Sequence, residues 1–468
     1  MNRLKRIYCL LGVLAAVCIA TFTVTRYEEK QEQIKNTDTI ILKVAPDSVT
    51  ALSWEYGSDS LAFHKDEAWL WDEDEAFPVD QEKIGDMLAQ FEAFGAAFLI
   101  EEVEDYGQYG LEEPECTVHL TAGEQDYAIT LGDFSTLDQQ RYVSIGDGNV
   151  YLVKEDPSES FNVGISDLID HDETPRFDNV TSIQFSGAES HDIFTAEDSV
   201  DTYCPTDIYF LRSGNENLPL DTSRVESYLT AIDDLSLTNY VSYNATEEEL
   251  AQYGLDDPEL TVTVAYTVED DEGNEVEETY VLHISRDPEE LAKLAEAEEE
   301  EEENEEEITA YARVGESRIL YQIPGVNYTE LMTVSYNDLR HLEVFPGEFS
   351  GITQLDITLE GKTYTVTSAD DEEGVRTWYY EEAELSTSKL KSALEDLKAD
   401  EFTDEKPAQK QEIALVLTLD NENHPQVEIK LYRYDGEHCL AVLDGEPFAL
   451  VERSQVVDLI EAVNAIVL

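Results

Sequence analysis

The sequence predicts an α+β protein: an N-terminal transmembrane helix followed by repeated units, each a mostly antiparallel sheet with a packed helix. Three observations support this prediction. An apolar segment without charges stands near the start of the chain, a six-residue motif occurs twice, and strand-like and helix-like stretches recur in the same order. Strands alternate apolar and polar residues with period two, whereas amphipathic helices have a period near 3.6, so the two patterns can be distinguished.

Length and composition favour several folded domains. The chain has 468 residues, 42% of them hydrophobic, which is ample material for packed cores despite a formal net charge of −76. Such a charge repels nucleic acid and anionic lipid headgroups, so neither is an expected partner. Two of the five cysteines lie in the apolar segment and the other three are far apart, so no disulfide framework is predicted.

Residues 7–25 are expected to form a transmembrane anchor behind a basic cytoplasmic tail at residues 1–6. The 18 residues Ile7–Val24 carry no charge, and at about 1.5 Å per residue they suit a hydrocarbon core of about 30 Å. Bases precede the segment and acids follow it, which predicts a single-pass protein of the cell membrane with its body outside the cytoplasm. A cleaved signal peptide is the alternative interpretation.

Three repeats are expected after a juxtamembrane linker at residues 26–46. Their predicted bounds are residues 47–175, 176–345 and 346–468. Each repeat opens with a strand-like run, at Val49–Trp54, Val180–Phe185 and Ile352–Ile357. Each then reaches a helix with apolar spacings of three and four, at Asp80–Phe94, Asp221–Leu235 and Ser386–Lys398. Four strands should follow each helix, and a last helix is predicted at Ser454–Val467.

A hexamer marks the first two repeats. Tyr109-Gly110-Leu111-Glu112-Glu113-Pro114 returns as Tyr253-Gly254-Leu255-Asp256-Asp257-Pro258. Glycine permits unusual backbone angles, leucine can enter a core and proline favours an extended chain before the next strand. The hexamer is therefore predicted to be structural, through Tyr109, Gly110, Leu111, Pro114, Tyr253, Gly254, Leu255 and Pro258.

The second repeat carries an acidic insertion at residues 287–307. Its position between two predicted strands is tolerable because lengthening a surface loop costs little. A calcium or basic-peptide site is one interpretation of its glutamates. Self-repulsion and the lack of oxygen-ligand spacing favour a solvated tract instead.

The hexamer, the strands after it and the N-terminal segment resemble the family of domain of unknown function 4340. The matching residues are Tyr109–Pro114 with Tyr127–Val153, and Tyr253–Pro258 with Thr279–Ile323. Members are often encoded beside permease and ATPase components of gliding-motility-type ABC transporters. The resemblance thus implies an accessory protein of the cell envelope and supplies no catalytic residues. The third repeat lacks the hexamer and matches loosely.

No enzymatic motif stands out. The sequence has no phosphate-binding loop, nucleophile elbow or H-E-x-x-H pair, and its cysteines and histidines are not spaced as metal ligands. With 105 acidic residues, a pair of carboxylates at glycosidase spacing would carry no information. No catalytic residue, cofactor or metal site is predicted, and the chain is not expected to be an enzyme.

The predicted function is protein–protein interaction as an accessory or partner subunit of an ABC-type transport system, with its permease or ATPase as the expected partner. The alternative is a cell-wall or glycan-binding surface module. Its support is aromatic residues that could stack on sugars, namely Trp54, Trp69, Trp71 and Trp378–Tyr380.

Overall fold

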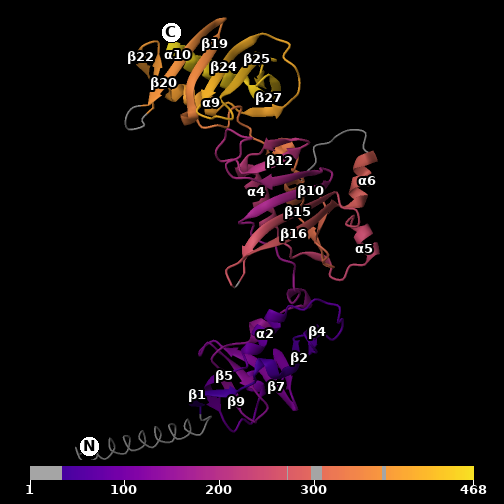
Figure 1. The fold of residues 1–468 in the computed structure, drawn as a ribbon. Coiled ribbons are helices and arrows are strands. Elements are labelled where there is room, and N and C mark those ends of the chain that lie inside the picture. The colour runs from indigo at the N-terminus through magenta and orange to yellow at the C-terminus, as the bar shows by residue number, and fades with distance from the viewer. Residues whose placement is uncertain (1–33, 271, 297–307, 371–375, 468) are drawn as a thin grey trace, which may run out of the picture. The chain divides into compact units, whose positions relative to one another are not determined.

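The computed structural model describes residues 34–270, 272–296, 308–370 and 376–467. The chain divides into two compact units, one ending at His171 and the other beginning at Asp172. The first unit contains one nine-stranded sheet and the second contains two (Figure 1). Every strand pairing among the described residues is antiparallel, and hydrogen-bonded neighbours are often distant in sequence.

In the first sheet, the second to fourth strands form a meander that runs to one edge. The chain then crosses to the other side through a helix, and the sixth to ninth strands form a second meander that starts beside the second strand and ends beside the fifth. The strand order is β1-β5-β9-β8-β7-β6-β2-β3-β4. The elements are β1 Ile34–Leu42, β2 Val49–Tyr56, β3 Asp59–Lys65, β4 Trp69–Trp71, α2 Gln81–Ala89, β5 Phe94–Ile100, β6 Cys116–Ala122, β7 Gln125–Ser135, β8 Gln140–Ser144, β9 Val150–Val153 and α3 Ser158–Phe161.

The second sheet repeats this path with a longer opening meander. Its order is β13-β12-β11-β10-β15-β16-β17-β18-β14. The elements are β10 Val180–Gly187, β11 His191–Thr195, β12 Tyr209–Ser213, β13 Glu216–Pro219, α4 Thr222–Asp233, β14 Tyr240–Ser242, α5 Glu247–Gln252, β15 Leu260–Glu269, β16 Glu275–Arg286, α6 Pro288–Glu296, β17 Ala310–Val314, β18 Leu320–Ile323, α7 Gly325–Met332 and α8 Tyr336–Leu339.

The third sheet has the same connectivity as the second, in the order β22-β21-β20-β19-β24-β25-β26-β27-β23. The elements are β19 Ile352–Leu359, β20 Lys362–Asp370, β21 Arg376–Tyr380, β22 Ala383–Leu385, α9 Ser388–Glu395, β23 Ala399–Phe402, β24 Gln411–Leu419, β25 Gln426–Arg433, β26 His438–Leu443, β27 Glu446–Glu452 and α10 Arg453–Val467. The first sheet differs by a three-strand opening meander and by β1 at its edge, but the path is otherwise the same in all three sheets, so the chain consists of repeated sheet units.

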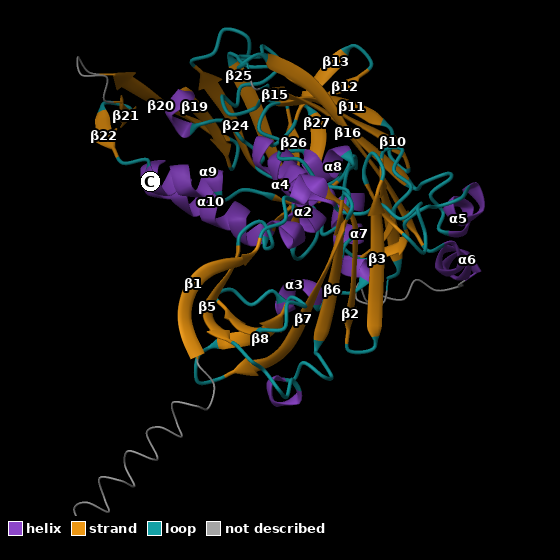
Figure 2. Cartoon of the chain, turned by 90° about the horizontal axis from the view of Figure 1, so that it is seen from below, coloured by secondary structure: helices purple, strands orange, loops and turns teal. Residues whose placement is uncertain are grey.

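Helices cover a sheet face because their apolar residues recur every three or four positions. In the first unit α2 buries Ile84, Met87 and Leu88, and Phe161 of α3 meets Trp54 edge-on with ring centroids 5.5 Å apart. In the third sheet α9 and α10 lie side by side (Figure 2) and share one core with the strands. Where these helices pack, a layer of helices covers one face of the sheet.

The predicted fold class requires correction. Strands make up 43% of the described residues and helices 21%, so the architecture is predominantly antiparallel β rather than α+β with a transmembrane helix. The helices are shorter than predicted, since Gln81–Ala89 replaces Asp80–Phe94 and Phe94 instead opens β5. The predicted linker at residues 26–46 contributes β1 to the first sheet.

The predicted single-pass location also requires correction. Within the parts of the chain that the structure describes, no helix is long and apolar enough to cross a membrane. The longest helix there, α10, has 15 residues. This finding contradicts the predicted cell-membrane location with a cytoplasmic N-terminus and an external body. The predicted tail and anchor at residues 1–6 and 7–25 lie outside the described residues.

Candidate functional site

The hexamer forms the same turn in both repeats. Leu255 N–H donates to the Leu250 carbonyl at 2.8 Å and Gly254 N–H donates to the Ala251 carbonyl at 3.3 Å. This pair of bonds defines a Schellman motif, which ends a helix at a glycine with positive φ. Gly254 has φ +71° and closes α5 accordingly.

In the first repeat the turn follows a short 3₁₀ helix, Gly107–Tyr109, and Gly110 has φ +70°. Leu111 N–H donates to the Tyr106 carbonyl at 3.1 Å, as Leu255 does to Leu250. A β-carbon at Gly110 would lie 2.4 Å from Asp133 Oδ1 and 2.8 Å from the Asp133 nitrogen. Glycine is therefore required here both by φ and by the close approach of β7.

The remaining hexamer side chains build small secondary cores. Tyr109 packs in one with Ile100, Val150 and Leu152, and its ring lies 4.9 Å from that of Tyr142. The matching core of the second repeat contains Leu250, Leu255, Tyr311 and Leu320, with Tyr253 packed against it. Pro114 and Pro258 are half-buried just ahead of β6 and β15.

A glutamate directly after each hexamer was missed by the sequence reasoning. Glu115 accepts hydrogen bonds from Tyr56 Oη at 2.6 Å and from the buried Arg141 guanidinium. Glu259 accepts hydrogen bonds from the backbone nitrogen of Arg286 at 2.7 Å and from Tyr328 Oη at 3.1 Å. Extending the comparison of the two hexamers by one residue would have found this pair. Both glutamates fasten the turn to strands, which is a structural role.

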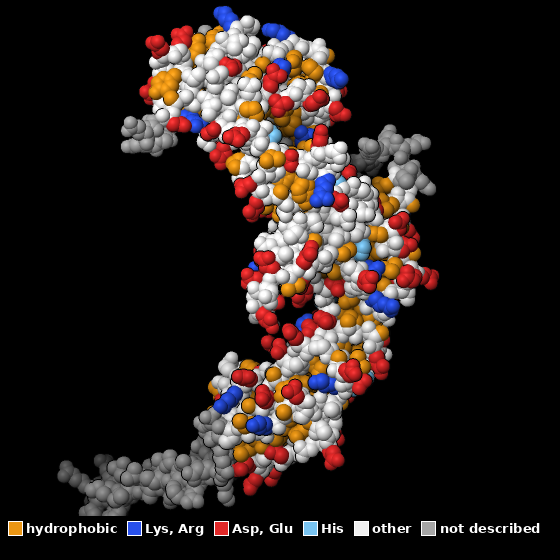
Figure 3. Space-filling view, viewed as in Figure 1, with side chains coloured by type: hydrophobic (Ala, Val, Ile, Leu, Met, Phe, Trp, Pro, Cys, Tyr) orange, Lys and Arg blue, Asp and Glu red, His pale blue; other side chains and the backbone are white. Residues whose placement is uncertain are grey.

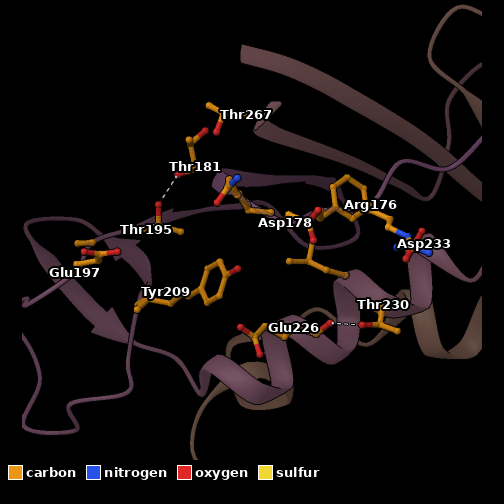
Figure 4. A pocket seen from close by; sticks show the side chains of 16 residues that line it. Arg176, Asp178, Thr181, Thr195, Glu197, Tyr209, Glu226, Thr230, Asp233 and Thr267 are labelled. Atoms are coloured by element: carbon orange, nitrogen blue, oxygen red, sulfur yellow. Dashed lines mark hydrogen bonds between the residues drawn. The ribbon is translucent and has the colours of Figure 1, made fainter. Parts of the chain in front are cut away.

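The candidate binding site is a groove in the second repeat (Figure 4). It has a volume of about 800 Å³ and lies between α4 and the ends of β10, β11 and β12. The segment before β10 supplies Arg176 to Asn179, and β15 supplies Thr267. The backbone places this segment, since Thr267 N–H donates to the Asn179 carbonyl at 2.9 Å. Its volume falls in the range of about 300–1,000 Å³ that is usual for ligand sites.

Carboxylates dominate the charge of this groove. Asp178, Glu197, Glu226 and Asp233 line it, and Arg176 is the one base among its lining residues. Acidic side chains are scattered over the whole visible surface (Figure 3), so acidity alone does not distinguish the groove. What distinguishes it is the concave wall that brings four carboxylates from different segments around one space.

Apolar surface lies between these carboxylates. Phe177, Leu229 and Tyr209 contribute to the lining. The Phe177 ring is fixed edge-on against Tyr266, with centroids 5.5 Å apart. Burial, with a smaller contribution from the Glu226 charge, raises the pKa of Tyr209, so its hydroxyl stays protonated at neutral pH. The groove thus offers acids beside the half-buried Phe177 ring, whereas Tyr209 and Leu229 lie largely beneath its surface.

The tryptophans that suggested glycan stacking are largely in cores. Trp54, Trp69 and Trp378 are 2%, 4% and 6% exposed, respectively. Trp54 stacks on Phe63 with ring centroids 5.5 Å apart, and Trp378 packs on Phe349. Buried rings cannot stack on a sugar, so these residues do not form a carbohydrate platform.

The acidic insertion begins with an ordinary helix start. Asp287 Oδ1 accepts hydrogen bonds from the backbone nitrogens of Glu289 and Glu290, which caps α6. Glu290 also pairs with Arg286 at 3.2 Å. Residues 297–307, which hold the glutamate run, lie outside the described residues.

Separately, the fold gathers metal-ligand side chains that are scattered in the sequence. Cys204, Asp207 and His341 place one ligand atom each within 4.8 Å of the others, and Asp221 and Glu343 do the same around His341. None of these spacings resembles a metal motif along the chain.

A family model described as a domain of unknown function, DUF4340, matches residues 69–201 and 212–415. No curated protein and no solved structure matches the chain. The two matched segments contain both hexamers and extend into the third sheet. Because they cover well over half of the sequence, the chain belongs to the DUF4340 family.

Proposed function

We propose that this chain is a non-catalytic partner protein of an ABC-type transport system and that it binds a basic segment of another protein in the groove of the second repeat. The observation that carries the proposal is the set of four carboxylates, Asp178, Glu197, Glu226 and Asp233, around one concave surface. Complementary charge on a partner accelerates association and selects against wrong partners.

A peptide suits this groove better than a small cation does. The carboxylates stand on the segment before β10, the segment after β11, and two turns of α4, so they surround the space without converging on one point. Lysine and arginine have long apolar stems that can lie along the half-buried Phe177 ring while their charged ends reach the acids.

A binding role agrees with the side chains in the groove. Its lining includes no histidine or cysteine, and its one phenol, Tyr209, holds its proton more tightly than usual. Catalysis generally needs a group whose pKa is tuned toward the working pH, beside a nucleophile or a second acid–base group.

The transport system enters the proposal through the family resemblance, which implies permease and ATPase neighbours. Copurification tests this part: tagged full-length chain should retain permease and ATPase subunits in near-stoichiometric amounts. The glycan alternative has no comparable support, since its tryptophans are mostly buried.

Peptide binding tests the groove. Fluorescence anisotropy of the full chain should detect binding of labelled 12-residue peptides that tile the permease and ATPase, with basic peptides preferred and binding weakened by salt. Reversing two groove charges, Glu226→Lys with Asp233→Lys, should weaken the preferred peptide at least about tenfold, which is about 1.4 kcal/mol.

The matched control reverses two exposed acids on the helix of the first repeat, Glu82→Lys with Asp86→Lys. This variant has the same net charge as the groove variant. If both pairs weaken binding equally, peptides respond to net charge alone and the groove is not the site. If acidic and basic peptides bind alike, the charge argument fails.

A further inference from the structure

Cys204, Asp207 and His341 meet in the second unit from two distant segments. Cys204 and Asp207 lie in the connection between β11 and β12, and His341 follows α8. Cys204 and Asp207 are 4% and 3% exposed, and the His341 side chain is 13% exposed. A buried thiol, carboxylate and imidazole in contact are unusual in a core and need a physical explanation.

The geometry is close to that of a metal site. His341 Nε2 lies 2.7 Å from Asp207 Oδ1, and the ligand atoms of all three residues lie within 4.8 Å of one another. Around a tetrahedral zinc ion, with bonds of about 2.0–2.3 Å, such atoms stand about 3.4–3.6 Å apart. Shifts of about 1 Å or less at the side-chain ends would bring them to that separation.

The other imidazole nitrogen faces carboxylates. His341 Nδ1 is 3.8 Å from Asp221 Oδ2 and 3.9 Å from Glu343 Oε2. Metal-binding histidines commonly direct their second nitrogen at a carboxylate, which fixes the ring and its tautomer. Asp207 is held as well, because Thr202 Oγ1 donates to its Oδ2 at 2.6 Å. Thr202 thus orients Asp207, and Asp221 and Glu343 lie where the supporting carboxylates of a metal site would stand.

The charge balance also favours a cation. Three carboxylates, from Asp207, Asp221 and Glu343, surround the ring, and Lys398 pairs with one of them at 2.9 Å. The negative potential of these carboxylates would attract a divalent ion.

A cavity of about 230 Å³ gives access to the cluster. Asp207, His341 and Glu343 line it together with Thr202 and His424. An ion could arrive through this space, and a water molecule there could complete a four-coordinate site that has three protein ligands.

The geometry points to a binding site for a divalent transition-metal ion, zinc by preference, with Cys204 Sγ, Asp207 Oδ1 and His341 Nε2 as ligands. Sulfur and imidazole select zinc over calcium or magnesium, which prefer oxygen. Binding requires a deprotonated Cys204 thiol and an unprotonated His341 Nε2, so metal affinity should rise with pH. The site is independent of the peptide groove and stands whether or not that groove binds protein.

Cobalt(II) provides the test. After chelator treatment and dialysis, the full chain is titrated with cobalt and its absorption is recorded. One equivalent should produce a thiolate-to-cobalt charge-transfer band with tetrahedral visible bands, and zinc should displace both. The many surface carboxylates would bind cobalt weakly through oxygen, without a charge-transfer band.

Cys204→Ser and His341→Gln should each abolish the band or weaken metal binding more than tenfold, and Glu343→Gln should weaken it about tenfold. The controls are Cys439→Ser, which removes another buried thiol, and His438→Ala, which removes a histidine beside Asp400 and Asp435. Circular dichroism confirms that each variant is folded. Absence of the band, or its persistence in folded Cys204→Ser, would overturn the inference.

Discussion

Replacing Gly110 with alanine should destabilise the first unit far more than the same change at Gly123. Both glycines have positive φ, +70° and +64°. A β-carbon at Gly123 meets nothing within 4 Å, whereas at Gly110 it would stand 2.4 Å from Asp133 Oδ1 and 2.8 Å from the Asp133 backbone nitrogen. The pair thus separates backbone strain from steric overlap.

The left-handed conformation should cost alanine about 1 kcal/mol at either position. Alanine also restricts the unfolded chain, and this partial compensation is the same at both sites. Moving β7 away from the turn at Gly110 should add about 1–3 kcal/mol, the usual cost of overpacking a site that cannot relax. The free energy of unfolding should therefore fall by about 1 kcal/mol for Gly123→Ala and about 2–4 kcal/mol for Gly110→Ala.

The tryptophans allow the difference in free energy of unfolding between the two variants to be measured in the full chain. Three of the four, Trp54, Trp69 and Trp71, lie in the first unit, so a Trp378→Phe background confines the fluorescence signal to it. Urea titrations followed by that fluorescence would give each free energy of unfolding. If the two variants agree within about 0.5 kcal/mol, the inferred close approach of the turn to β7 is wrong.

Four further changes follow from the same structure. Arg141→Met should lower the free energy of unfolding of the first unit by about 1–3 kcal/mol in the same fluorescence assay, because it leaves two partly exposed carboxylates without their hydrogen-bonded cation. Hydrogen bonds from Tyr56, and to a smaller extent from Arg141, lower the pKa of Glu115 below its usual 4.5. The stability that ionised Glu115 contributes is therefore complete above pH 4.5 and is lost as pH falls through the lower pKa of the folded state. Glu115→Gln should make the free energy of unfolding fall less steeply with pH in this acidic range. Leu255→Ala should cost about 2–4 kcal/mol through the cavity left beside Leu250, measured by chemical denaturation followed by circular dichroism. Thr246→Ala should cost about 1 kcal/mol in that assay by removing the side-chain cap of α5.

The repeats and their strands were within reach of the sequence because their signals are local. The runs beginning at Val49, Val180 and Ile352 open β2, β10 and β19 at those residues. Asp444-Gly445 forms a tight turn between β26 and β27, with φ of +50° and +91°, as the Asp-Gly pair favours. Alternation and turn chemistry act over a few residues, so a single sequence displays them.

The groove and the metal-ligand cluster depend on pairings that no local pattern displays. Val180 pairs with Tyr266 across β10 and β15, and that register sets one wall of the groove. His341 meets Asp207 from 134 positions away. The helices were overestimated because Phe91 and Phe94 continue the apolar spacing of α2, although Phe94 already belongs to β5.

The sheets of the second unit end in strands too short to serve as templates for another chain. β13, β14, β22 and β23 have only three or four residues, compared with ten and twelve in β15 and β16. Pro219 removes one backbone donor from such a border, and Glu216, Glu384 and Glu401 place charge on three of them. The borders of these two broad sheets therefore offer another chain only a short row of unpaired backbone groups on which to extend the sheet.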